Sequence, residues 1–286
     1  MSPATLLYNW LRRQLPTTAT EWLDGQAKIV SGTPTDRELN LAISLVSRKL
    51  GKDPLQLDPS DLEQAARARK NWDPTGWTLD QAGRIYLLLC CNVTAERFRA
   101  WLDQLCQTAD VGELVAFYRG LPLYPDAAQH RLRAAEGIRS NMKAVFEAVA
   151  HRNPYPVEEL AEGPWNQMVL KTLFVGSTLH PIQDLETRAN PALMRMLCDY
   201  AHERWAAGRP ISPELWRCVG RHADPAALAD LERVLNTGTA AEREAAALAL
   251  GDSPEMAAQA ILQRHPDLAA AVAGGKITWT TVVQPH

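Results

Sequence analysis

The residues best suited to chemistry lie in one helical stretch, which runs from Asn190 to Arg209. At about 100° per residue, its apolar side chains cover a broad arc, and Asp199 and His202 lie opposite them. Together with Glu203, these side chains could serve as an acid, a base or metal ligands. The helical spacing instead favours a solvated face for Asp199 and His202.

Arg204 differs from these residues, because it falls near the middle of the apolar arc. A buried guanidinium without a partner is very costly. The side chain of Arg204 must therefore reach water, pair with a carboxylate or bind an anion. A structural ion pair is the simpler interpretation, and an anion-binding site is the functional one.

A short helix, predicted from Trp165 to Val175, also mixes apolar and polar residues. Apolar side chains cover most of its circumference, which is typical of a helix buried on nearly all sides. Asn166, Gln167 and Lys171 interrupt that surface. Because buried polar groups need hydrogen-bond partners, these residues either tether neighbouring loops or line a pocket.

Two long loops, predicted for residues 151–165 and 176–191, flank this helix, and loops of that length are often functional. The polar side chains of this region could form one donor-rich site for a phosphate, carboxylate or polyhydroxylated ligand. The candidate site comprises Arg139, Asn141, Asn153, Asn166, Gln167, Lys171 and Arg204, with Asp199, His202 and Glu203 as weaker candidates.

The composition and the absence of known motifs argue against several classes of function. The chain has 30 basic and 33 acidic residues, with neither half markedly basic, which argues against nucleic acid and anionic membranes as partners. No phosphate-binding loop, nucleophile elbow or metal-ligand spacing is present, so we expect no metal and no cofactor. Five cysteines, an odd number, indicate reduced thiols in a cytoplasmic protein. No apolar run approaches the roughly 20 residues of a membrane helix.

The fold that positions these residues is predicted to be all-α and multi-helical. Helical periodicity occurs nearly everywhere, and Asp110 with Glu113 and Thr239 with Glu242 form capping boxes. Residues 276–283 are the exception, and their β propensity predicts a short extended C-terminal arm. We expect a single helical domain over 1–286, with an N-terminal part (1–125), a motif-bearing centre (126–220) and a C-terminal part with the tail (221–286).

A weak repeat favours α-solenoid, HEAT-like packing in the C-terminal third. Ser212-Pro213-Glu214-Leu215 recurs as Ser253-Pro254-Glu255-Met256, at an offset of 41 residues. That offset lies in the range of HEAT and armadillo units. The alternative is that Ser-Pro-Glu is simply a common way to begin a helix.

Several motifs in the centre of the chain together resemble the EboA family. They are residues 137–141 (GIRSN), 153–156 (NPYP), 165–171 (WNQMVLK), 188–191 (RANP), 199–204 (DYAHER) and 213–217 (PELWR). The resemblance implies a role in bacterial secondary-metabolite trafficking, such as export of a cyanobacterial sunscreen precursor. It supplies no catalytic residues.

Two hypotheses follow. The first is a non-enzymatic helical adaptor that binds a pathway protein, or a small anionic or polyhydroxylated metabolite, in a groove with Trp216 at its rim. The second is an enzyme acting on a phosphorylated or polyol intermediate, with Lys171 and Arg204 stabilising charge. The missing catalytic motifs favour the first.

Overall fold

The computed structural model describes residues 1–32 and 34–283. In this part of the chain there is no β-strand, only one isolated bridge between Pro54 and Thr78. The predicted all-α, multi-helical fold is therefore confirmed. Residue contacts divide the chain into two compact units, 1–161 and 162–286. The predicted centre, 126–220, spans the boundary between these units, and the single-domain organisation stays a prediction.

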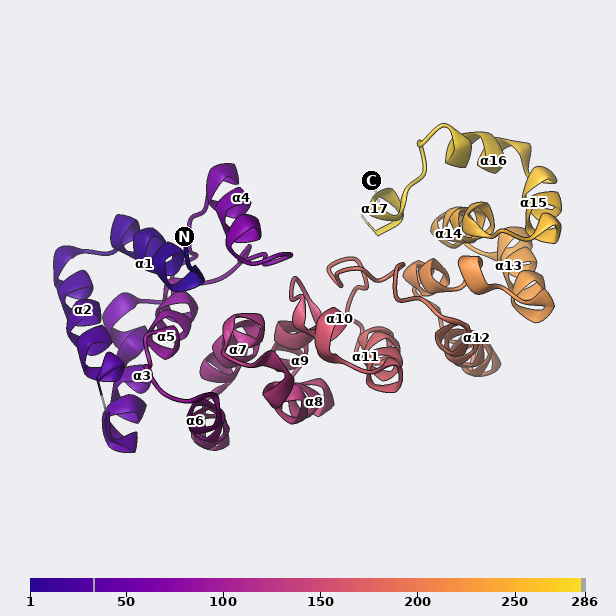
Figure 1. Ribbon diagram of the computed structural model, residues 1–286. Helices are drawn as coiled ribbons and strands as arrows, with labels where there is room; N and C mark the ends of the chain where they lie inside the picture. Colours follow the sequence, from indigo (N-terminus) through magenta and orange to yellow (C-terminus); the bar gives the residue numbers. More distant parts are fainter. Residues whose placement is uncertain (33, 284–286) are drawn as a thin grey trace. The chain divides into compact units, whose positions relative to one another are not determined.

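The N-terminal unit contains ten α-helices and two 3₁₀ helices within its described residues (Figure 1). They are α1 (Pro3–Gln14), α2 (Thr17–Ser31), α3 (Asp36–Leu50), α4 (Pro59–Ala68), α5 (Leu79–Leu89), α6 (Ala95–Thr108), α7 (Val111–Arg119), η1 (Leu121–Leu123), η2 (Ala127–His130), α8 (Arg131–Arg139), α9 (Lys143–Ala150) and α10 (Tyr155–Glu159).

Local signals explain where these helices begin and what they bury. The Thr94 hydroxyl caps α6 by accepting from the backbone N–H of Arg97. The predicted capping box of Asp110 and Glu113 starts α7. Helix α5 packs against α1, α3 and α7. The core of this unit therefore forms around α5 and α7.

The C-terminal unit begins at α11, and its helices are α11 (Glu162–Phe174), α12 (Pro191–Ala206), η3 (Pro213–Cys218), η4 (Gly220–His222), α13 (Pro225–Thr237), α14 (Ala240–Asp252), α15 (Met256–Gln263), α16 (Pro266–Ala273) and α17 (Trp279–Val283). Alanine-rich α14 lies at its centre and contacts α13, α15, α16, α17, η3 and η4. Six consecutive residues, 245–250, are buried in α14, because small side chains allow close packing. At Gly220, an added Cβ would lie 1.9 Å from the Ala249 carbonyl oxygen.

Two loop predictions differ from the structure. The predicted loop 151–165 contains α10 and the first turn of α11, because a proline near a helix start is compatible with helix. The predicted C-terminal arm is wrong over residues 279–283, which form α17. Thr278 starts that helix by exchanging hydrogen bonds with Thr281. Burial of Ile277 and Val282 explains why packing overrides their β propensity. Residues 284–286 lie outside the described part of the chain.

The two copies of the Ser-Pro-Glu repeat fold differently. Pro213 and Glu214 begin the 3₁₀ helix η3, and Glu214 is buried. Glu255 instead precedes α15 as an exposed N-cap residue. Helices α13 and α14 pack against each other, but HEAT-like stacking stays a prediction.

Candidate functional site

A buried carboxylate fixes the irregular segment between α11 and α12. Glu214, which is 5% exposed, accepts hydrogen bonds from the Thr178 hydroxyl at 2.7 Å, the Leu179 N–H at 3.0 Å and the His180 N–H at 2.8 Å. Hydrogen bonds to a charged acceptor are stronger than neutral ones. Glu214 therefore holds the start of this segment against η3.

Further contacts hold the rest of the same segment. Arg217 donates from Nε to the Glu186 carboxylate, and His222 Nε2 lies 2.8 Å from the Ala189 carbonyl oxygen. The guanidinium of Arg188 stacks 4.5 Å from the centre of the Trp165 ring. Residues 176–190 form no helix, but contacts with side chains from η3, η4 and α11 hold them in place.

Asn166, a predicted site residue on α11, takes part in this tethering. It is buried, and its side-chain amide exchanges two hydrogen bonds with that of Asn190, at 3.1 and 2.9 Å. Asn190 in turn caps α12 by accepting from the Leu193 N–H at 2.9 Å. The geometry matches the loop-tethering alternative for Asn166.

The remaining predicted residues of α11 lie partly in solvent. Gln167 is exposed and Lys171 is half-buried, and partial burial lowers the pKa of the Lys171 ammonium. Phe174 is 75% exposed. The prediction that this helix is buried on nearly all sides is therefore wrong. Gln167 and Phe174 face solvent, and Lys171 does so in part.

The predicted residues of the N-terminal unit separate into buried and exposed positions. Asn153 is buried, and its Nδ2 donates to the carbonyls of Tyr118 and Ala148, both at 3.0 Å. Its Oδ1 accepts from the Tyr155 N–H at 3.0 Å. Asn153 therefore joins α7, α9 and α10. Arg139 ends α8, and Arg139 and Asn141 are both exposed.

Arg204 is half-buried and binds the backbone just beyond the end of its own helix. Its Nε and NH2 groups donate to the Pro210 carbonyl oxygen at 3.1 and 2.9 Å. The Pro210 carbonyl therefore serves as the partner that the Arg204 guanidinium needs, and neither a carboxylate nor an anion is required. The expected ion pair is thus replaced by two hydrogen bonds to one backbone carbonyl in the segment that follows α12.

The weaker candidates on α12 lie at the surface, as the helical spacing predicts for Asp199 and His202. Asp199, His202 and Glu203 are exposed. His202 Nε2 lies 2.8 Å from both carboxylate oxygens of Asp230 on α13. Close by, the Arg233 guanidinium stacks 4.1 Å from the centre of the Trp205 ring. These contacts join α12 to α13.

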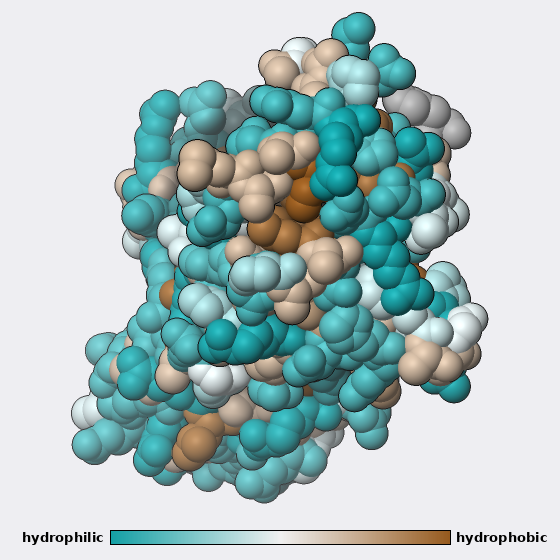
Figure 2. Space-filling model, turned by 90° about the vertical axis from the view of Figure 1, so that its right-hand side faces the viewer, coloured by the Kyte–Doolittle hydropathy of each residue, from teal (hydrophilic) through white to brown (hydrophobic). Residues whose placement is uncertain are grey.

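The C-terminal unit carries a surface groove between α13 and α15. It encloses about 620 Å³, and its lining includes the buried apolar side chains of Ala223, Leu228 and Ile261. The acidic side chains of Asp224, Glu232 and Glu255 also line it. Figure 2, seen from the side on which α13 and α15 lie in Figure 1, shows a hollow with strongly apolar side chains inside, bordered by polar and weakly apolar ones. Trp216, expected at the rim of such a groove, is instead fully buried, because it packs in the core beneath Trp205.

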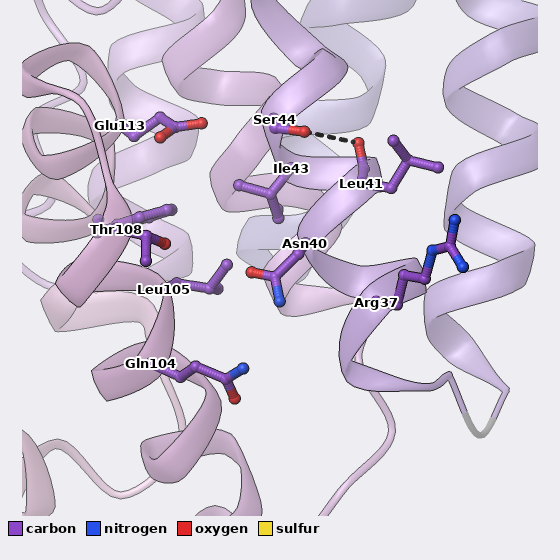
Figure 3. A pocket seen from close by; sticks show the side chains of 10 residues that line it. Arg37, Asn40, Leu41, Ile43, Ser44, Gln104, Leu105, Thr108 and Glu113 are labelled. Carbon is purple, nitrogen blue, oxygen red and sulfur yellow. Dashed lines mark hydrogen bonds between the residues drawn. The ribbon is translucent and has the colours of Figure 1, made fainter.

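The N-terminal unit carries a second cavity, of about 520 Å³, between α3, α6 and α7. Apolar residues from all three helices line it, and so do amide, hydroxyl and charged side chains. Figure 3 shows these side chains, which are Arg37, Asn40, Leu41, Ile43, Ser44, Gln104, Leu105, Thr108, Glu113 and Phe117.

None of the predicted site residues lines either cavity. The polar centre expected from sequence corresponds in each unit to tethers such as Asn153 and Asn166. Glu214 was missed, although its place in the motif 213–217 was a usable signal. The lining of the second cavity was missed as well, because amides and hydroxyls on amphipathic helices carry no motif. In the described residues, no group of three or more His, Cys, Asp or Glu side chains could hold a metal ion.

Comparison with known proteins places the chain in a family. The model of the EboA family, described as metabolite traffic protein EboA, matches residues 4–220. The chain therefore belongs to the EboA family, as the motifs of its centre indicate. No curated protein and no solved structure matches it significantly. Among the described residues, no helix is both long and apolar enough to cross a membrane.

Proposed function

We propose that this protein is a non-enzymatic helical adaptor that supports the trafficking of a secondary metabolite. It docks a partner protein of the same pathway in the groove between α13 and α15. The groove carries the proposal, because an apolar hollow with a polar rim is the usual form of a protein-binding site. The family assignment supplies the setting of metabolite traffic.

The chemistry of the groove indicates what kind of segment would bind. Its apolar floor, formed by Leu228, Ile261 and Ala223, suits aliphatic side chains on one face of a helix. Asp224 and Glu255 at the rim are exposed, whereas Glu232 is paired with Arg264 at 2.7 Å. This acidic rim favours a partner segment with lysine or arginine flanking its apolar residues.

The start of α15 adds a second apolar element next to the groove. Met256 is 88% exposed and stands between Glu255 and Ala257, two residues that line the groove. Methionine side chains are flexible and polarisable, so they adapt well to partner surfaces. A partner that lies in the groove can therefore extend its apolar contact over Met256.

The proposal includes a cytoplasmic location and no cofactor. The five cysteines are free thiols, as expected for a reducing compartment. The alternative, an enzyme acting at the polar centre, gains no support from the two cavities, because the residues assigned to it lie elsewhere.

Filling the groove tests this function in the bacterium that carries the chain. Ala257→Trp places a large ring on an exposed position of the lining. We expect the metabolite of the pathway to accumulate where it is made, with the protein still folded. Ala270→Trp, on an exposed position of α16 outside the groove, should leave its distribution normal. A normal distribution with folded Ala257→Trp protein would contradict the proposal.

A further inference from the structure

We infer that the cavity between α3, α6 and α7 is a binding site for a small, uncharged, polyhydroxylated ring. This site lies in the N-terminal unit and does not depend on the proposed docking groove. Its volume, about 520 Å³, suits a small molecule of one or two rings. The ligand class follows from the floor, the polar groups and the charge of the cavity.

The floor of the cavity is apolar and buried. Ile43 on α3, Leu105 on α6 and Phe117 on α7 line it, and each is buried. A sugar or cyclitol ring presents C–H groups on its faces, and these pack against aliphatic and aromatic side chains. A floor contributed by three helices is also largely preformed, which lowers the cost of ordering on binding.

The polar groups of the lining can both donate and accept. Figure 3 shows Asn40 on α3 and Gln104 on α6 pointing toward the same space. Asn40 Nδ2 donates to the Asp36 carbonyl at 2.8 Å, which leaves its Oδ1 available as an acceptor. In the described part of the chain, no hydrogen bond occupies the side chains of Gln104 and Thr108. Such amides and hydroxyls match ligand hydroxyls, which also donate and accept.

The negative charge around Glu113 disfavours an anionic ligand. Glu113 lines the cavity, and its Oε1 lies 3.7 Å from NH2 of Arg84. The Arg84 side chain is 2% exposed and already pairs with Asp80 at 2.6 Å. One guanidinium thus serves two carboxylates, so the cluster carries a formal charge of −1. A carboxylate in this position accepts well from ligand hydroxyls.

The positive group of the lining lies apart from this cluster. Figure 3 shows Arg37 at the opposite end of the cavity from Glu113. Arg37 is exposed to solvent, where water and salt screen its charge. The geometry therefore points to hydroxyl groups bound near Glu113 and Gln104, rather than to a phosphate held at Arg37.

Calorimetric titration of the full chain with myo-inositol, methyl glucoside and glucose 6-phosphate tests the inference. We expect binding of at least one uncharged probe, weakened about tenfold in Gln104→Leu, since a lost hydrogen-bond partner costs about that factor. Gln107→Leu is the matched control, because Gln107 is exposed on the same helix but does not line the cavity. Glu113→Gln should also weaken binding, while a glutamine preserves the capping box.

Three results would overturn the inference. The first is no heat of binding from either uncharged probe with folded wild-type protein. The second is equal affinity in Gln104→Leu and Gln107→Leu, which would place the ligand elsewhere. The third is binding of glucose 6-phosphate alone, which would show that the site selects an anion. Melting curves of each variant establish that the protein is folded before titration.

Discussion

Replacing Glu214 with alanine removes the carboxylate that receives three hydrogen bonds from residues 178–180. Each hydrogen bond to a charged group contributes about 1.5–3 kcal/mol. Water can reach exposed His180, whereas Leu179 is fully buried, so part of the loss is recovered. We expect Glu214→Ala to lower the free energy of unfolding by about 3–5 kcal/mol, and Glu214→Gln by about 1–2 kcal/mol.

The assay combines denaturant unfolding with hydrogen exchange. About 3 kcal/mol corresponds to roughly a hundredfold faster exchange of the Leu179 and His180 amides when the segment opens locally. Glu203→Ala is the control, because Glu203 is exposed on α12, and it should change stability by less than about 0.5 kcal/mol. If Glu214→Ala unfolds like Glu203→Ala and these amides exchange at the wild-type rate, the tethering role of Glu214 is refuted.

Three further predictions concern other contacts. Asn153→Ala should lower the free energy of unfolding by about 2–4 kcal/mol, because three buried hydrogen bonds are lost. Asn141→Ala, at an exposed position, should change that free energy by less than about 0.5 kcal/mol. Equal losses in the two variants would contradict this prediction. Gly220→Ala should cost more than about 3 kcal/mol, because its Cβ would collide with the Ala249 carbonyl oxygen; a wild-type melting temperature would refute that packing. Burial lowers the pKa of His130 below its usual value, so its contribution to stability should be lost as pH falls below about 6.5. Urea unfolding at pH 7.5 and 5.5 should show that the free energy of unfolding falls less between these pH values in His130→Gln than in the wild type. An equal fall in both proteins would contradict this role of His130.

Much of the fold could be predicted from the sequence because its signals are local. The capping boxes at Asp110 and Thr239 each mark a helix start that the structure confirms. The C-terminal arm shows the limit of this reasoning. Its β-branched residues favour a strand, but burial of Val282 against the C-terminal unit stabilises a short helix instead.

The candidate site was harder to predict, because one helix pattern does not identify the partners of a side chain. The helical wheel predicts Arg204 near the middle of the apolar arc, where it needs a partner, but that partner, the Pro210 carbonyl, follows from how the chain turns after α12. Asn166 was recognised as a polar residue on an apolar helix, yet only the structure pairs it with Asn190. The two cavities form where separate helices meet, so neither has a signature in the sequence.

The most direct test of the proposed adaptor role maps what lies in the groove. A photo-reactive amino acid at Ala257 would be activated in cells that make the metabolite, and the attached peptide would be sequenced by mass spectrometry. We expect a pathway protein attached through an apolar segment flanked by lysine or arginine, and no such product from Ala270 on α16. Attachment of the same peptides at both positions, or none at Ala257 in folded protein, would contradict it.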